Sequence, residues 1–283
     1  MELIHTVDWM KQLARQAREE GGIVGLVPAG DGLHAGHLGM VRAAQRECSA
    51  VVVSVLGDSE QGHSGRSLDA DRAALESLPA GYLFAPSAGE FYPPDFQTSV
   101  VVSEIAERLE GRSRPGHLRA AATAALKLCS IVQPAFVYIG RKQAQQACIF
   151  RRMARDLNLD AGIVVCPIVR EPDGLAAGSR NARLSDEERR AAPVLHRALT
   201  AAQERVARGE RMAEPLAEEM RRVLVAEPLA TVDYVEIVDA DTFDPAPRLR
   251  GSCLAVLAAF IGSTRLTDNM LIEERSGRVI CTI

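Results

Sequence analysis

An apolar run leads into two closely spaced histidines in Ile23-Val24-Gly25-Leu26-Val27-Pro28-Ala29-Gly30-Asp31-Gly32-Leu33-His34-Ala35-Gly36-His37, and helical spacing follows at residues 38–46. The run predicts a buried strand, so the histidines lie at a strand-to-helix turn. Gly36 has no Cβ and lets a ligand come close to the backbone. A helix N-terminus presents N–H groups and a partial positive charge to an anion. Because the imidazoles of His34 and His37 can also hydrogen-bond phosphate oxygens, this turn predicts phosphate binding.

The two histidines also have plainer interpretations. A turn of this kind can carry histidines that serve only its own structure. Zinc binding is disfavoured, because His34 and His37 are three residues apart but no cysteine or acidic ligand stands nearby at metal-binding spacing. The chain contains no G-x-x-x-x-G-K-[ST] motif, which excludes a P-loop.

Charge and hydropathy argue against two classes of partner. The chain has 283 residues, a formal net charge of −4 and a pI of about 5.9, which argues against a nucleic-acid-binding surface. No apolar run reaches the length of a membrane span, and residues 1–12 lack the basic and apolar regions of a signal peptide. We therefore expect neither a nucleic-acid partner nor a membrane partner.

The cysteines indicate a reducing compartment. They are scattered, form no C-x-x-C motif and mostly lie in apolar segments: Cys48, Cys129, Cys148, Cys166, Cys253 and Cys281. This distribution is typical of reduced, buried thiols. We therefore expect a cytoplasmic location.

Short apolar runs alternate with helical patterns over the first 168 residues. Runs rich in Val and Ile predict buried strands at residues 23–27, 50–56, 82–85, 136–139 and 162–168. The expected helices are residues 6–20, 38–47, 68–77, 98–109, 116–132 and 142–157. This alternation is typical of an α/β protein with a doubly wound parallel sheet, whose ligands bind beyond the carboxyl ends of the strands. His34, Gln61 and Lys142 all follow such ends.

The pattern changes after Pro167. Residues 169–181 are polar and glycine-rich, and a strongly helical stretch follows at residues 185–225. Ser185 and Glu188 fit the N-cap and N3 positions of a capping box. Later strands are expected at residues 232–238 and 278–283, with an apolar, Ala-rich stretch at 253–261. We place a domain boundary near Ile168, which predicts domains of residues 1–168 and 169–283.

Six blocks follow one another along the chain: residues 27–37, 84–86 with 92–93, 109–117, 140–146, 170–181 and 261–269. In this order they resemble the motifs of the pantothenate synthetase (pantoate–β-alanine ligase) family over essentially the whole chain. The histidine motif is similar to the nucleotide-binding signature of adenylyl-transferring enzymes. The resemblance implies a Rossmann-like, HIGH-type nucleotidyltransferase fold, a smaller C-terminal α+β lid domain and a homodimer.

The resemblance also implies a reaction. In that family the carboxylate of pantoate attacks the α-phosphorus of ATP, with Mg²⁺ as cofactor, and pyrophosphate leaves. The amine of β-alanine then displaces AMP from the acyl-adenylate. ATP supplies the activation, so the enzyme orients its substrates and stabilises charge. A lysine suits the developing phosphate charge, and the planar fork of an arginine suits phosphate oxygens; a glutamine can both donate and accept at a hydroxy acid.

The family's functional positions map onto this chain by motif. The residues matched to the catalytic, phosphate-facing set are His34, His37, Lys142, Ser179 and Arg180. Those matched to nucleotide contacts are Pro28, Gly36, Gly140 and Gln143, and those matched to contacts with the small-molecule acid are Gly30, Asp58, Gln61 and Gln146. Asp71 matches the magnesium-binding acid across a segment that is shorter here than in the family.

Several positions depart from the family pattern. Gly30 stands where the family has methionine, Asp58 where it has asparagine, Gln143 where it has aspartate, and Gly178 where it has serine. A carboxylate at Asp58 is unfavourable beside a substrate carboxylate. Three alternatives stay open: the same adenylation with a different acid and amine, nucleotidyl transfer that stops at the adenylate, and a catalytically degenerate nucleotide-binding homologue.

Plainer roles also stay open for individual residues. Lys142 could be an ordinary solvated lysine, and residues 170–181 could be only a loop between domains. His117 follows Arg114-Pro115-Gly116 at an expected helix start, where it could serve only as a cap. The ordered set of residues, rather than any one of them, favours the ligase.

Overall fold

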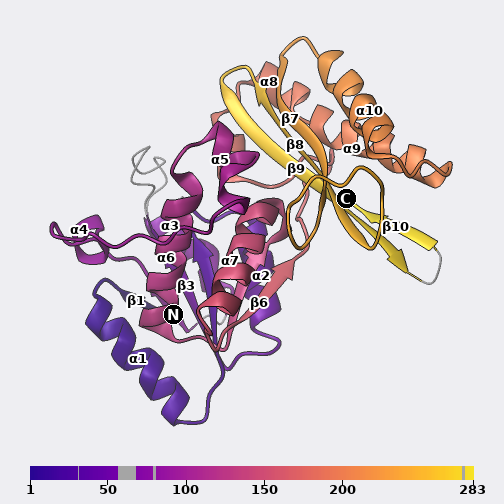
Figure 1. The fold of residues 1–283 in the computed structure, drawn as a ribbon. Helices are drawn as coiled ribbons and strands as arrows, with labels where there is room; N and C mark the ends of the chain where they lie inside the picture. The colour runs from indigo at the N-terminus through magenta and orange to yellow at the C-terminus, as the bar shows by residue number, and fades with distance from the viewer. Residues whose placement is uncertain (31, 57–67, 79–80, 276–277) are drawn as a thin grey trace. The chain divides into compact units, whose positions relative to one another are not determined.

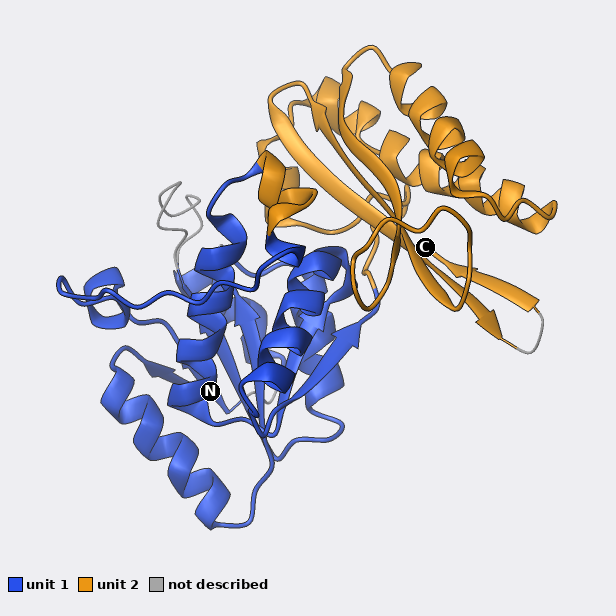
Figure 2. Ribbon diagram, viewed as in Figure 1, with its two compact units in different colours: residues 1–106, 114–167 blue, residues 107–113, 168–283 orange. Residues whose placement is uncertain are grey.

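The computed structural model describes residues 1–30, 32–56, 68–78, 81–275 and 278–283. The chain folds as two compact units (Figures 1 and 2). Unit 1 comprises residues 1–106 and 114–167, and unit 2 comprises residues 107–113 and 168–283. Within the described ranges, no helix combines the length and the apolar character that crossing a membrane requires.

Unit 1 is built on a parallel sheet, as the sequence predicts. Its strands are β1 (Glu2–Ile4), β2 (Val24–Ala29), β3 (Ala50–Val55), β4 (Tyr82–Phe84), β5 (Phe136–Gly140) and β6 (Gly162–Cys166). They pair in parallel in the order β1-β4-β3-β2-β5-β6. Strand β1 is not among the predicted strands; it is only three residues long and pairs with β4 at the edge of the sheet.

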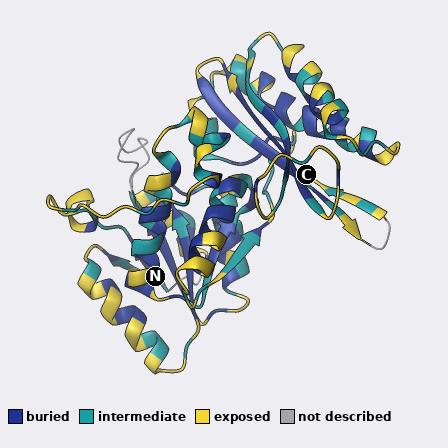
Figure 3. Cartoon of the chain, in the orientation of Figure 1, coloured by how far each residue is buried: buried dark blue, intermediate teal, exposed yellow. Residues whose placement is uncertain are grey.

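Helices cover both faces of this sheet, which confirms the doubly wound architecture (Figure 1). The main helices are α1 (Val7–Glu19), α2 (Ala35–Ala44), α3 (Leu68–Glu76), α6 (His117–Val132) and α7 (Ala144–Asp156). Along β2, Val27 joins the buried core beneath α2 and α3, whereas Leu26 and Pro28 line the opposite side against α6 and α7. Successive strand residues point to opposite faces, so both faces of β2 are buried (Figure 3).

The structure corrects two of the helices predicted over the first 168 residues. Helix α2 begins at Ala35 rather than at residue 38, because His34 caps its first turn. Residues 98–109 do not form the expected helix: they contain only the 3₁₀ turn η1 (Ile105–Glu107), and the one-turn helix α5 (Glu110–Ser113) follows. Glu104 and Leu109 have φ values of 65° and 44°, which an α-helix does not accommodate. Helix α4 (Ala88–Phe91) is similarly short.

Unit 2 is an antiparallel sheet with helices packed on it. Its strands β7 (Ala230–Asp239), β8 (Ser252–Ile261), β9 (Thr264–Arg275) and β10 (Arg278–Thr282) pair in the order β10-β9-β8-β7. The Ala-rich stretch forms β8, which is buried along almost its whole length and shares one apolar core with the helices α9 and α10. The expected smaller α+β domain is therefore present as this unit.

The predicted helical stretch 185–225 is divided into three helices, α8 (Asp186–Ala191), α9 (Val194–Ala207) and α10 (Ala213–Val225). Pro193 starts α9, because proline fits the beginning of a helix but not its interior. Gly209 follows α9 with a φ of 100°, a left-handed conformation that glycine adopts readily. The capping box of Ser185 and Glu188 is confirmed at the start of α8.

The cysteines form no disulfide. Cys48, Cys129, Cys148, Cys166 and Cys253 are buried and Cys281 is half-buried, as the apolar surroundings predict. Burial raises the pKa of Cys129 to about 11, so its thiol stays protonated and unreactive near neutral pH.

Candidate active site

The two histidines of the opening motif form an interlocked cap on α2. The Nδ1 atom of His34 accepts a hydrogen bond from the backbone N–H of Gly36 at 3.1 Å, and Nδ1 of His37 accepts from the backbone N–H of His34 at 3.3 Å. Their ring centres lie 4.0 Å apart. Because Nδ1 is an acceptor in both rings, a neutral ring carries its proton on Nε2. Each imidazole therefore has a second nitrogen that can donate to an anion.

His37 is held neutral by its surroundings. Its side chain is buried, and burial, together with the nearby positive charge of Lys142, lowers the pKa of His37 to about 4. At neutral pH the ring is consequently a hydrogen-bond donor without charge. Lys142 supplies the positive charge in this part of the site, so the two residues divide charge and hydrogen bonding between them.

Gly36 is required by the contact with His34. A Cβ at residue 36 would lie 2.8 Å from Cε1 and 2.9 Å from Nδ1 of the His34 ring, so the ring would have to move. Gly140 is not constrained in this way, because a Cβ there would make only an ordinary 3.8 Å contact with the sulfur of Met40. Gly30 is exposed, and a Cβ there would meet no atom within 4 Å.

Topology brings the histidine cap and Lys142 to one edge of the sheet. Strands β2 and β5 are neighbours, paired through Gly25 with Phe136 and Leu26 with Val137. The chain leaves β2 toward β3 on one side, while β5 and β6 lie on the other side. The point where strand order reverses is where doubly wound sheets bind ligands. His34 follows β2, and Lys142 lies in the 3₁₀ turn η2 (Arg141–Gln143) that follows β5.

Asp71 anchors the backbone just before the two histidines. It lies in α3 with only 2% of its surface exposed, and its Oδ1 accepts a 2.7 Å hydrogen bond from the backbone N–H of Leu33. Among the described residues, no three His, Cys, Asp or Glu side chains are grouped so that they could hold a metal ion. Asp71 therefore anchors the turn through one of its two oxygens, and its match to the family's magnesium-binding acid stays a prediction.

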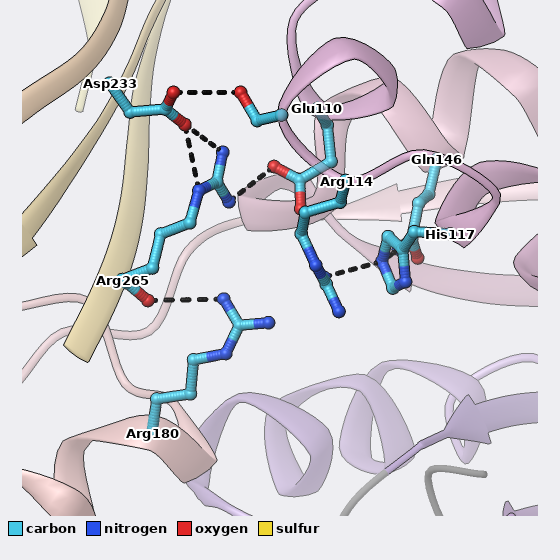
Figure 4. Close-up of polar contacts among 8 residues, drawn as sticks. Glu110, Arg114, His117, Gln146, Arg180, Asp233 and Arg265 are labelled. Carbon is cyan, nitrogen blue, oxygen red and sulfur yellow. Dashed lines mark hydrogen bonds and ion pairs between the residues drawn. The ribbon is translucent and has the colours of Figure 1, made fainter. Parts of the chain in front are cut away.

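Gln146 belongs to a second cluster in unit 1, which was not predicted from the sequence as a cluster. The Nε2 atom of His117 lies 2.9 Å from Nη1 of Arg114 and 3.1 Å from Nε2 of Gln146 (Figure 4). An arginine can only donate, so Nε2 of His117 is an acceptor and its ring proton is on Nδ1. Gly116, at a φ of 84°, is the N-cap of α6 and His117 is its first helical residue, so the ring of His117 contacts Arg114 and Gln146 from just inside the helix.

Ser179 and Arg180 share one turn in unit 2. They lie in the 3₁₀ turn η3 (Ser179–Arg183), and Nη1 of Arg180 donates to the backbone carbonyl of Arg265 at 3.2 Å. The segment that leads to this turn is anchored by Arg170, which donates from both terminal nitrogens to the buried carboxylate of Asp268 at 2.7 and 2.9 Å. Residues 170–181 are thus tied into unit 2 by a largely buried ion pair.

The remaining predicted residues divide into those the structure places and those it does not. Pro28 is half-buried in β2, and Gln143 is exposed in η2. Asp58 and Gln61 lie outside the described residues. The contacts that these residues make with substrates stay predictions.

Comparisons with known proteins agree over nearly the whole chain. The family model for pantoate–β-alanine ligase matches residues 2–271. A pantothenate synthetase from Caldicellulosiruptor bescii is 39% identical over 282 residues, which cover 97% of this chain and 100% of the relative. Another from Roseiflexus castenholzii is 49% identical over 259 residues, which cover 89% of this chain and 93% of the relative.

Solved structures show the same likeness. The crystal structure of a pantothenate synthetase from Thermus thermophilus has a TM-score of 0.87 at 37% identity and covers 95% of this chain and 98% of that chain. A pantoate–β-alanine ligase from Francisella tularensis, complexed with beta-gamma ATP and β-alanine, has a TM-score of 0.75 at 27% identity and covers 96% of this chain and 97% of its own.

Proposed function

The chain belongs to the pantoate–β-alanine ligase family, and from this premise we propose that it joins pantoate to β-alanine with ATP as the activating substrate. A pantoate carboxylate oxygen attacks the α-phosphorus of ATP, the bond from that phosphorus to the β,γ-pyrophosphate breaks, and pyrophosphate leaves. The amine of β-alanine then attacks the acyl carbon, loses a proton and displaces AMP. The enzyme is an AMP-forming carbon–nitrogen ligase.

The observation that carries this proposal is the histidine cap at the N-terminus of α2. Two imidazoles with Nε2–H donors stand at the positive end of a helix dipole, beside Lys142. Such fixed donors stabilise negative charge that moves onto the phosphates as the α-phosphorus is attacked. A neutral His37 donates a hydrogen bond to the phosphates but carries no charge that would attract the carboxylate of a substrate. Lys142 supplies the positive charge that neutralises the phosphates.

The other predicted residues take complementary roles in this proposal. Ser179 and Arg180 would bind the departing pyrophosphate, because an arginine fork matches phosphate oxygens. Gln146, next to the donors of Arg114 and the ring of His117, would hold the hydroxyl and carboxylate of the acid. Gln61 and Asp58 would complete that pocket, and Pro28, Gly36, Gly140 and Gln143 would contact the nucleotide.

Magnesium enters the proposal with the nucleotide. The described residues hold no three-ligand group for a metal, and one oxygen of Asp71 is bonded to the backbone of Leu33. Magnesium commonly takes only one or two protein carboxylates and completes its shell with phosphates and water. We therefore propose MgATP as the substrate form, with the ion held mainly by the triphosphate.

Three further predictions come from the family resemblance. A homodimer would be detected by the molar mass in solution, and a cytoplasmic location by fractionation of cells. A division of labour between an ATP- and acid-binding domain of residues 1–168 and a lid of residues 169–283 would be detected by protection of residues 170–181 from proteolysis when ATP is added.

The primary test measures AMP and pyrophosphate from MgATP, pantoate and β-alanine, with His34→Ala as the matched control. Pantothenate formed with one AMP per product supports the proposal. ATP binding without AMP formation would contradict it and favour an altered acid and amine, which a panel of hydroxy acids and amines would then identify. AMP ester that persists with every amine would favour simple nucleotidyl transfer, and absence of any turnover a degenerate homologue.

A second test exploits the scarcity of lysine. The chain has only three lysines, at positions 11, 127 and 142. Labelling with an amine-reactive reagent followed by peptide mass spectrometry therefore reports directly on Lys142. We expect ATP to protect Lys142 but not Lys127, whose ammonium lies 4.4 Å from the ring centre of Phe96 and serves as the internal reference. Equal labelling with and without ATP would remove Lys142 from the phosphate site.

A further inference from the structure

Arg265 is the centre of a nearly buried charge cluster within unit 2 (Figure 4). Its side chain, 8% exposed, lies in β9 and is paired with two carboxylates that are themselves largely buried. Nη1 donates to Oε2 of Glu110 at 2.7 Å, and Nε and Nη2 donate to Oδ2 of Asp233 at 2.9 and 2.6 Å. The forked geometry of a guanidinium is what allows one side chain to serve both partners.

The cluster joins a short segment to the sheet of unit 2. Glu110 begins α5, and Ser113 at the end of the same helix donates to Oδ1 of Asp233 at 2.9 Å. Arg108, just before the helix, pairs with Asp244 and donates to the backbone carbonyl of Phe243. Residues 107–113 are therefore fastened at three points to β7, β9 and the turn after β7.

The same residue also contacts Arg180. The backbone carbonyl of Arg265 accepts a hydrogen bond from Nη1 of Arg180 at 3.2 Å. The side chain of Arg265 forms ion pairs with Glu110 and Asp233. Without Arg265, Glu110 and Asp233 would lose the guanidinium that both of them bind, close to the point where Arg180 is held. A largely buried carboxylate attracts a cation, and Arg180 is held beside this cluster by the carbonyl of Arg265, so these groups would compete for its guanidinium.

We propose that Arg265 is a positioning residue for the adenylation step. It neutralises Glu110 and Asp233 and holds Arg180 through its carbonyl, so that Arg180 is directed to the ATP phosphates rather than to these two carboxylates. This inference rests on the phosphate-binding role of Arg180 in the proposed function. Arg265 itself contacts neither substrate in this scheme, and its effect passes through Arg180.

The test compares the KM for ATP and kcat of pyrophosphate release in the full-length enzyme at saturating pantoate. In Arg265→Gln we expect the KM for ATP to rise about tenfold or more, as the loss of a charge-assisted contact implies. In the variant that combines Arg265→Gln with Glu110→Gln and Asp233→Asn, we expect the KM to return to within about twofold of the wild-type value, because no competing carboxylate is left. Arg275→Gln, in the same strand but 66% exposed, is the matched control and should leave KM unchanged.

The outcomes separate the inference from its premise. If Arg180→Ala leaves the KM for ATP unchanged, the role of Arg180 in the proposed function is wrong. If Arg180→Ala raises KM but Arg265→Gln does not, the positioning role alone is overturned. A merely structural role would lower the stability of Arg265→Gln without changing the KM of its folded fraction. Should Arg265→Gln fail to fold, Arg265→Lys provides the second variant: it keeps the charge that neutralises Glu110 and Asp233, so the KM for ATP should stay within about twofold of the wild-type value, and a rise of about tenfold would overturn the inference.

Discussion

Lowering the pH tests the electrostatic account of His37 most directly. The folded protein holds the pKa of His37 at about 4, against an ordinary value of 6.5. As the pH falls below 6.5, the unfolded chain takes up a proton on this residue while the folded protein does not. The contribution of His37 to the free energy of unfolding is therefore fully present well above pH 6.5 and is lost as the pH falls toward 4, because protons favour the state that binds more of them.

The size of the effect follows from the two pKa values. The shift from 6.5 to about 4 corresponds to a maximum of about 3 kcal/mol of unfolding free energy, fully lost below pH 4. At pH 5 the unfolded form is almost fully protonated and the folded form is not, which costs about 2 kcal/mol. The buried position of the ring, 7% exposed, is the reason that screening by solvent does not remove the effect.

Two measurements on matched proteins check this expectation. Proton–nitrogen correlation spectra of the histidine rings give each pKa and tautomer directly, and His37→Gln assigns the signal. We expect His37 to titrate near pH 4 with its proton on Nε2. Between pH 7 and pH 5, urea unfolding of the wild type should lose about 2 kcal/mol more than that of His37→Gln. A His37 titration midpoint near its ordinary value, or equal losses in both proteins, would refute the reasoning.

Three further changes have defined outcomes. In Gly36→Ala the new methyl group displaces the ring of His34, so kcat/KM for ATP should fall about tenfold or more with an unchanged circular dichroism spectrum; unaltered kinetics would contradict the cap. Asp71→Asn weakens the anchor of Leu33 and should cost about 1–3 kcal/mol of unfolding free energy that excess Mg²⁺ does not restore, whereas rescue of activity by Mg²⁺ would make Asp71 a metal ligand. Asp268→Asn removes the buried counter-charge of Arg170, whose side chain is largely buried, and should cost about 3–5 kcal/mol; Arg208→Gln, at an exposed pair, should cost less than about 1 kcal/mol by the same denaturation assay.

The strands of unit 1 were predictable because burial on both faces leaves a continuous apolar run. Residues 23–27 and 50–56 appear as β2 and β3, and every boundary lies within two residues of the predicted one. The start of α2 was not predictable by the same logic, because N-caps are usually Ser, Thr, Asp or Asn. Here His34 fills that position with its ring nitrogen, so a residue singled out for chemistry also shapes the local backbone.

Long-range partners account for most of what could not be predicted from the sequence. The hydrogen bond from Leu33 to Asp71 spans 38 residues, and that from Arg265 to Glu110 spans 155. No local pattern indicates either one. The failed helix at 98–109 has a local cause: residues 98–103 are all β-branched residues or serine, which are weak helix formers, and the backbone of Glu104 and Leu109 is left-handed. The predicted strands correctly placed His34, His37 and Lys142 just beyond the carboxyl ends of β2 and β5. In a parallel sheet these ends lie along the same edge, so a strand pattern is enough to predict this part of the site.

The short segment 107–113 gives the chain an unusual order of assembly. Unit 2 contains this segment and residues 168–283, so its first piece leaves the ribosome well before the strand that will fasten it. Glu110 can pair with Arg265 only after 155 further residues have been synthesised. Residues 114–167, which belong to unit 1, emerge during that interval. Synthesis from the N-terminus can complete much of the parallel sheet early, but residues 107–113 gain their first anchor only when β7 is made and their last when β9 is made. A nascent chain stalled before residue 230 should therefore expose residues 107–113 to protease, and the finished protein should not.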